Sequence, residues 1–169
     1  MVNTNKSSNQ EKQLRISQMS KKLNNKSYSA SYLLQEEMNN LGLANKPEFV
    51  KYVNEIKFME QQLDTLCQEY AVEYHNTIIP MVRAFRQEQE KLAQKHKQEQ
   101  QRLLSRGVTP ALQAKNMYDT QYIEMEQLKA SQTAMKDETI DRLAQKMNAC
   151  KQNIRITFIE SLWRIYREY

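Results

Sequence analysis

Glycine and proline are scarce in this sequence. The 169 residues include two glycines and three prolines, and neither type occurs after Pro110. A phosphate-binding loop needs several glycines close together, so this composition excludes one. The two cysteines are too few for a disulfide framework. Long apolar runs are missing as well, which argues against a transmembrane helix and a secretory signal. These absences favour an intracellular protein, which we expect in the cytoplasm.

Sequence motifs typical of metal-binding or catalytic sites are also missing. The two histidines, His75 and His96, lie outside any Glu-x-x-His arrangement of the kind that builds metal sites in helical bundles. The sequence contains no Ser/His/Asp set and no Cys-x-x-Cys pair. We therefore expect neither enzymatic activity nor a bound metal or cofactor.

Residues that favour helices are abundant instead, chiefly Lys, Glu, Gln, Met, Ala and Leu. The apolar fraction is a modest 40%, which fits thin helix-on-helix seams better than a thick globular core. The sequence predicts an all-α fold, namely a long antiparallel helical hairpin or coiled coil with a short N-terminal helix and a disordered basic N-terminal tail.

The predicted tail, residues 1–28, holds the net charge of +5. Residues 1–26 contain six Lys or Arg and one Glu, while the rest of the chain has 19 residues of each sign. We expect a flexible segment, because its short apolar pattern would be marginal as an isolated helix. The alternatives are a segment that docks on an acidic partner, nucleic acid or an anionic membrane, and a mitochondrial targeting segment. The candidate polyanion contacts are Lys12, Arg15, Lys21, Lys22 and Lys26.

A short docking helix is predicted at residues 29–42. Ser29 or Ser31 can cap its start, and Gly42 followed by Leu43 is typical of a helix end with a left-handed residue. The apolar stripe of this helix is narrow, which predicts that it packs on the main body rather than standing free.

The main body, residues 46–169, is predicted to be the hairpin. Its first arm, residues 46–105, carries apolar residues at alternating steps of three and four from Phe49 to Tyr70, the period of a coiled-coil seam. Pro80 interrupts this arm chemically, and we favour a kinked continuous helix over a break. Gly107 can make the turn, Thr109 can cap the second arm, and this arm covers residues 110–169.

Folding the two arms together about Gly107 places apolar residues opposite one another, for example Leu63 opposite Ile154 and Phe49 opposite Tyr166. The same register brings Cys67 level with Cys150. We expect free thiols there, and a disulfide only in an oxidising compartment. Near the turn, residues 86–102 are almost wholly polar, so we expect no core around them but an exposed helix or a surface for a partner.

The open end of the hairpin is rich in aromatic residues. One interpretation is that they fill the seam with help from the 29–42 helix. The other is that the wide apolar stripe at 154–169 is not covered by two helices and requires a third helix or a partner chain. The candidate partner-binding residues are Phe49, Tyr52, Phe158, Leu162, Trp163, Tyr166 and Tyr169.

We therefore expect a non-enzymatic coiled-coil scaffold or adaptor, which acts as a homo-oligomer or as a subunit of a multiprotein assembly. Two alternatives stay open. One is a peripheral membrane-binding helical bundle that uses the basic N-terminal segment, and the other is a weak nucleic-acid-associated accessory protein.

Overall fold

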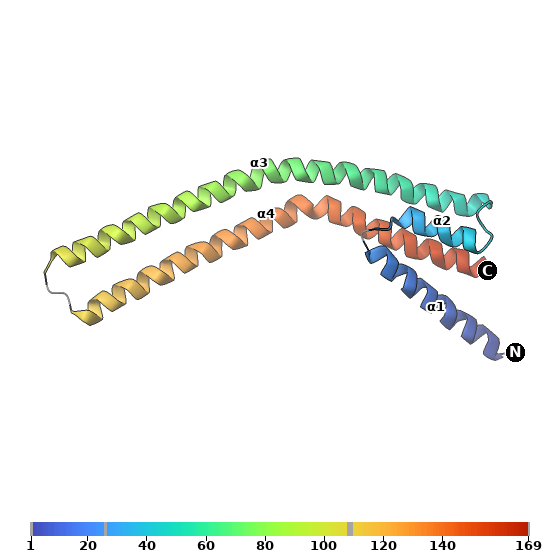
Figure 1. Cartoon of the computed structure of the whole chain (residues 1–169), viewed down its shortest axis with the longest axis horizontal. Coiled ribbons are helices and arrows are strands. Elements are labelled where there is room, and N and C mark those ends of the chain that lie inside the picture. The colour runs from blue at the N-terminus through green and yellow to red at the C-terminus, as the bar shows by residue number, and fades with distance from the viewer. Residues whose placement is uncertain (1, 26, 108–109, 169) are drawn as a thin grey trace. The chain divides into compact units, whose positions relative to one another are not determined.

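The structure is a computed structural model that describes residues 2–25, 27–107 and 110–168, with side chains from residue 9 onward. Four α-helices make up this part of the chain, and no strand occurs in it (Figure 1). They are α1 (Val2–Asn24), α2 (Ala30–Asn40), α3 (Pro47–Ser105) and α4 (Ala111–Glu168). The long helices α3 and α4 are the arms of an antiparallel hairpin, which confirms the predicted all-α fold.

The chain divides into two compact units. Unit 1 consists of Met1–Gln68 and Lys146–Tyr169, and unit 2 consists of Glu69–Gln145. Unit 1 therefore contains α1, α2, the first part of α3 and the last part of α4. Unit 2 contains the remainder of α3 and α4 and the turn between them.

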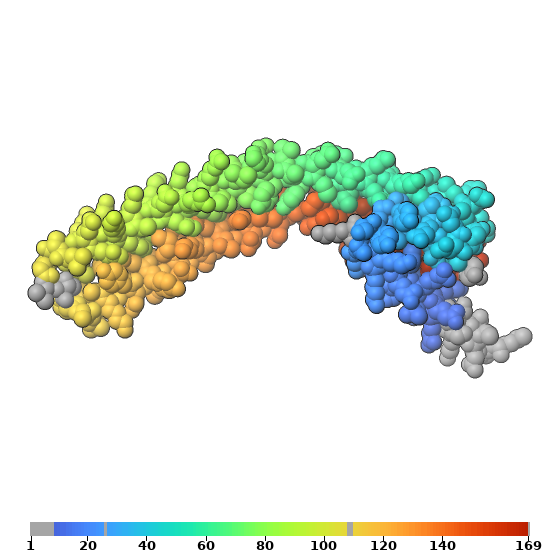
Figure 2. All heavy atoms as spheres, in the orientation of Figure 1, coloured from blue at the N-terminus to red at the C-terminus, as the bar shows by residue number. Residues whose placement is uncertain are grey.

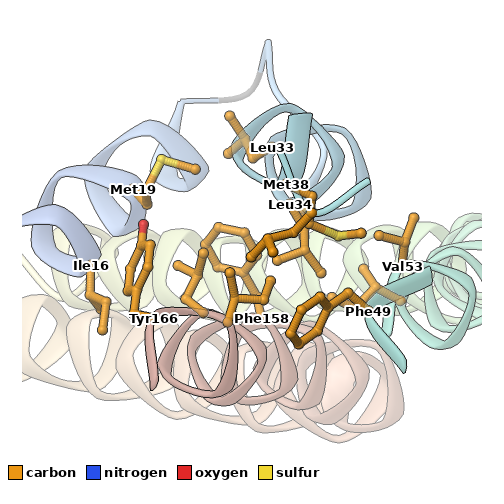
Figure 3. Close-up of a cluster of buried hydrophobic side chains, with 14 of the residues drawn as sticks. Ile16, Met19, Leu33, Leu34, Met38, Phe49, Val53, Phe158 and Tyr166 are labelled. Atoms are coloured by element: carbon orange, nitrogen blue, oxygen red, sulfur yellow. The ribbon is translucent and has the colours of Figure 1, made fainter. Parts of the chain in front are cut away.

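The core of unit 1 draws apolar side chains from all four helices. Ile16 and Met19 come from α1, and Leu33, Leu34 and Met38 come from α2 (Figure 3). Ala30 on α2 and Leu43 after it also belong to this core, and the long helices supply Phe49, Val53, Ile56, Ile154, Phe158, Leu162, Ile165 and Tyr166. In Figure 2 the side chains of α1 and α2 lie over this part of the hairpin. The two short helices thus pack against the apolar seam between α3 and α4 and help to bury it.

The N-terminal segment differs from the flexible tail expected for residues 1–28. Residues 2–24 form the helix α1, and Ile16 and Met19 are 7% and 5% exposed. The physical reason is tertiary. An isolated helix with so weak an apolar pattern is marginal in water, but packing its apolar residues on α2 and α4 supplies the missing stabilisation. Arg155 on α4 also donates to Asn24 Oδ1 at 3.0 Å, near the end of α1.

Helix α2 ends where the sequence predicted. Its start is capped by Ser29, whose hydroxyl oxygen accepts a hydrogen bond from the backbone amide of Tyr32. The Glu60 carboxylate on α3 accepts a second hydrogen bond, from the backbone amide of Ser31 at 3.0 Å. At its other end Gly42 has φ +70°, and the amide of Leu43 donates to the carbonyl of Met38 at 2.9 Å. This is the Schellman arrangement, in which a left-handed glycine lets the chain reverse onto the helix.

Helix α3 is continuous through Pro80, as the apolar rhythm of the sequence favoured. Proline has no amide hydrogen, so the carbonyl of Asn76 loses its usual partner four residues on, yet the flanking turns keep the helix intact. The helix begins at Pro47, and the carbonyl of Lys46 accepts the amides of Phe49 and Val50. Proline is well suited to a first helical position, where an amide has no partner in any case.

The turn between the arms contains Gly107 with φ +92°, a left-handed backbone conformation that favours glycine. The second arm, α4, then runs from Ala111 to Glu168. The predicted arms of 46–105 and 110–169 agree with these helices to within about two residues. Thr109, expected to cap the second arm, lies outside the described residues.

Candidate functional site

Four of the seven predicted partner-binding residues lie inside the core of unit 1. Phe49 and Tyr166 are 2% exposed, and Phe158 and Leu162 are fully buried. Their neighbours come from this chain, since α1 and α2 cover the stripe that the hairpin alone would leave open (Figure 3). These side chains are therefore core residues and present no surface to a partner in this structure.

Tyr52 and Trp163 are half-buried at the edge of the same core. Arg164 lies over the ring of Tyr52 at 5.3 Å and donates to its hydroxyl at 3.3 Å, so the phenol is largely engaged within the chain. Tyr169 lies outside the described residues. The aromatic cluster at the open end thus matches the interpretation in which it fills the seam.

Arg15, a predicted polyanion contact, is engaged inside unit 1. The Arg15 Nε lies 2.7 Å from Oε1 of Glu37, a residue that is only 4% exposed. The Arg15 guanidinium also lies 5.9 Å from the centre of the Tyr166 ring. A carboxylate so deeply buried needs a charged partner, because an unpaired buried charge is costly. Arg15 therefore fixes α1 on α2 and α4 and is not available as a free basic residue.

Burial, Glu37 and Arg15 together determine the ionisation of the Tyr166 phenol. Burial raises the pKa of Tyr166 well above its ordinary value, and the Glu37 carboxylate beside it adds to the rise, while Arg15 opposes it. The Tyr166 hydroxyl therefore stays neutral at physiological pH. The junction of α1, α2 and α4 holds one cation and one anion in a largely apolar setting.

The other predicted basic contacts differ in their exposure. Lys21 and Lys22 are exposed, Lys12 is half-buried, and Lys26 lies outside the described residues. With Arg15 engaged, the exposed basic contacts of this helix reduce to two adjacent lysines near its end. Of the four described residues, Arg15 and Lys22 line one groove together with Glu37.

Unit 2 is held together by a seam of buried glutamines. Gln132 on α4 is 5% exposed, and its amide donates to the carbonyl of Phe85 at 3.2 Å and to Glu88 Oε2 at 3.1 Å. Its own oxygen accepts from Gln89 Nε2 at 2.7 Å. Both hydrogens and the oxygen of this side-chain amide are thereby bonded, as a buried amide requires.

A second layer repeats this arrangement eleven residues away on each helix. Gln121, which is 6% exposed, donates to the carbonyl of His96 at 3.2 Å and to Glu99 Oε2 at 3.1 Å, and accepts from Gln100 Nε2 at 2.8 Å. The buried His96 adds a contact between its Nε2 and Glu124 Oε2 at 3.1 Å. Because each layer bonds a buried amide only in one alignment, the two layers together fix the register of α3 against α4.

This seam was not predicted from the sequence. Residues 86–102 were expected to be too polar to pack, whereas they pack through hydrogen bonds between side chains and backbone. A signal was present, since Gln-Glu-Gln occurs at 87–89 and again at 98–100. Glutamines at 121 and 132 share the same spacing of eleven. An 11-residue repeat, about 3.67 residues per turn, keeps one face of a helix in a seam just as a heptad does.

A group of exposed apolar side chains lies on α4 in unit 2, outside the glutamine seam. We call it the α4 outer face and define it by four residues, which are Leu112, Tyr118, Tyr122 and Ile123. Their exposed fractions are 70%, 49%, 68% and 53%. Leu112 and Ile123 are eleven residues apart and so lie on nearly the same side of the helix, and Tyr118 and Tyr122 are neighbours at one-turn spacing. This surface was not among the sequence-based candidates.

The two cysteines are free thiols in unit 1, and both are half-buried. The Cys150 Sγ lies 3.6 Å from the carbonyl of Met59, at an open groove that Met59, Leu66 and Ala149 also line. Burial raises the pKa of the Cys150 thiol, and Cys67 acts in the same direction. A raised pKa makes this thiol a weaker nucleophile at neutral pH, which fits a packing role.

Within residues 2–25, 27–107 and 110–168, no group of three or more His, Cys, Asp or Glu side chains is placed to hold a metal ion. No helix in the same ranges combines the length and the apolar character that a membrane span requires. Comparison with protein-family models, with curated proteins and with solved structures gave no match.

Proposed function

We propose that the protein is a non-enzymatic helical scaffold or adaptor subunit that binds another protein chain through the α4 outer face. Unit 1 supplies the folded anchor in this proposal, and unit 2 presents the binding surface. This moves the proposed contact to the part of α4 that follows the turn, because four of the candidates at the open end of the hairpin, Phe49, Phe158, Leu162 and Tyr166, are in the core.

One observation supports the proposal above the others. Among the described residues of unit 2, only Ile78 and Ala144 are buried apolar residues, whereas seven large apolar side chains are about half exposed or more. The seven are Val72, Leu104, Leu112, Tyr118, Tyr122, Ile123 and Met135. Four of them form the α4 outer face. Clusters of exposed apolar side chains typically mark surfaces that are covered by another chain.

The chemistry of the surface supports a protein partner. Tyrosine combines a large apolar ring with a hydroxyl and is enriched where protein interfaces bury their central residues. Leu112 and Ile123, eleven residues apart, lie on nearly the same side of the helix, as apolar anchors of a docking helix do.

The experiment that tests this function is a comparison of two surface variants in native cells. A Leu112→Glu/Ile123→Glu chain and a Leu104→Glu control are each fused to a proximity-labelling enzyme, and labelled proteins are identified by mass spectrometry. Leu104 is 71% exposed, so it matches Leu112 in type and exposure but lies on α3. We expect the wild type and the control to share a set of labelled proteins that the double variant loses.

Equal labelling by all three chains would contradict the proposal. Circular dichroism of each purified chain checks that the helices are intact, so that a loss of labelling reflects the surface rather than unfolding.

A further inference from the structure

We propose that a basic groove in unit 2, next to the α4 outer face along the helix, binds an acidic segment of the partner chain. The inference deepens the proposed function, on which it rests, by naming the chemistry of the partner. It is carried by the charges that line the groove and by the apolar side chains that line it with them.

The groove is lined by residues of both long helices and has a volume of about 410 Å³. Its charged lining residues are all cations, namely Arg86 on α3 and Lys129 and Lys136 on α4. Arg86 and Lys129 are exposed, Lys136 is half-buried, and none of the three forms an ion pair with another described residue. Three unpaired cations in one groove produce a positive potential that attracts a negatively charged group.

Carboxylates of this chain do not neutralise the groove. Those within about one helical turn of the three cations are Glu88, Glu90, Glu126, Asp137 and Glu138. None of the five lines the groove, and none forms an ion pair in the part of the chain that the structure describes. Grooves with basic residues in unit 1 differ, because Arg15 shares its groove with Glu37, and Arg155 shares its groove with Glu60. The groove in unit 2 therefore offers an incoming carboxylate cations without a competing anion.

The remaining lining favours a peptide over a nucleic acid. Val82 and Phe85, both half-buried, line the groove beside the cations, so a fitting ligand presents apolar groups between its charges. Lys129 and Lys136 are seven residues apart on α4, which is about 10 Å along the helix. A partner helix with two carboxylates seven residues apart and an apolar residue midway between them matches this spacing.

The groove continues the α4 outer face. Tyr122 and Tyr118 lie seven and eleven residues before Lys129, so the three side chains fall on nearly the same side of α4. A chain that covers the two tyrosines is thereby led toward the groove. In such a contact the apolar residues supply affinity, and the charges select the partner and its register.

The test measures the binding of three fluorescent probes to the full chain by fluorescence anisotropy. The first probe is a helical peptide with glutamate at every seventh position and leucine between the glutamates. The second is the same peptide with glutamine in place of glutamate, and the third is a single-stranded oligonucleotide of the same net charge as the first. We expect the acidic peptide to bind about tenfold more tightly than either other probe, and its affinity to fall as salt is added.

Variants of the groove locate the binding. Lys129→Glu/Lys136→Glu should weaken the binding of the acidic peptide about tenfold or more, and Arg86→Glu, on the other helix, should weaken it as well. Lys91→Glu/Lys95→Glu is the matched control, because it changes the net charge of the chain by the same amount. Both of its lysines are exposed on α3, and their spacings of five and nine from Arg86 place them on the other side of that helix. Circular dichroism of each chain checks that the helices are intact.

The inference is overturned if the chain does not prefer the acidic peptide to the glutamine peptide, or if the oligonucleotide binds more tightly than the acidic peptide. Equal binding of the acidic peptide by the Lys129→Glu/Lys136→Glu chain and its control would overturn it too. So would self-association of the wild type, measured by sedimentation velocity, that the same double substitution abolishes, because the groove would then be occupied by a second copy.

Proximity labelling with the Lys129→Glu/Lys136→Glu chain separates this inference from the proposed function. If the labelled proteins depend on Leu112 and Ile123 but not on the two lysines, the acidic segment is wrong and the proposed function stands. If they depend on the lysines but not on Leu112 and Ile123, the α4 outer face is wrong and the groove stands.

Discussion

Unit 1 and unit 2 are built from the same two long helices, but they are held together by different interactions. Unit 1 buries fifteen apolar side chains, fourteen from its four helices and Leu43 from the segment between α2 and α3. The buried residues described for unit 2 are four polar and two apolar. Apolar burial is strong but tolerant of repacking, while a buried hydrogen-bonded amide demands one alignment. The difference indicates that unit 1 provides most of the stability and that the glutamine layers of unit 2 provide the register.

Loss of a core ring in unit 1 should have the largest effect on stability. Phe158 is fully buried, and Phe158→Ala should lower the free energy of unfolding by about 3–5 kcal/mol, from lost burial and from the cavity left behind. Phe58→Ala is the matched control, because Phe58 is 60% exposed and should change stability by less than about 0.5 kcal/mol. Urea unfolding followed by circular dichroism measures both. Similar losses in the two variants would mean that the core is not where the structure places it.

The glutamine layers should have smaller and local effects. Gln132→Ala leaves the Gln89 side chain without its acceptor and should cost about 1–3 kcal/mol, seen as faster amide hydrogen exchange in unit 2. Since Gln121 has the equivalent partners, Gln121→Ala should match it to within about 0.5 kcal/mol. Gln127→Ala, at an exposed position of α4, is the control and should leave exchange unchanged. If Gln132→Ala and Gln121→Ala lowered the stability of unit 2 by different amounts, the two glutamine layers would not be equivalent.

The Arg15–Glu37 pair should decide whether α1 stays docked. Arg15→Met leaves the Glu37 carboxylate buried without its cation, at a cost of about 1–3 kcal/mol, toward the lower end because the Arg15 side chain is 44% exposed to screening solvent. Faster exchange in residues 9–24, with unit 2 unaffected, would be the sign of undocking. Adding Glu37→Gln to the same chain should recover part of the loss, because the buried charge is then removed. A double variant that is worse than the single one would contradict this account.

The smallest effect concerns Tyr166 at high pH. Its pKa is raised in the folded chain, so its contribution to stability is fully present below the unfolded value of about pH 10 and declines as the pH rises above it. The unfolding free energy of the wild type should therefore fall relative to that of Tyr166→Phe as the pH rises from about 9 to about 11. Urea unfolding at a series of pH values measures it, and a constant difference would show that the phenol is not shielded in the way described.

The extent of sequence-based prediction can be seen from individual residues. Gly42 and Gly107 marked helix ends correctly, because they act through local backbone geometry that needs no partner. The heptad from Phe49 likewise predicted the seam of unit 1. The α4 outer face and the glutamine layers were not predicted, because whether Tyr122 or Gln132 is exposed depends on which side of α4 meets α3.

The sequence by itself determined the helical state, the turn and the approximate alignment of the two arms, since these follow from periodicity and from residues that stop helices. Only the tertiary structure decided that α1 is a docked helix, because its Arg15 and Met19 are stabilised by distant residues on α2 and α4. It also decided that a polar stretch forms a seam, because a glutamine is buried at low cost only where another helix bonds its whole amide. A sequence pattern therefore determines where a helix forms. Whether a side chain of that helix is buried depends on which other helix packs against it, and the pattern does not specify that helix.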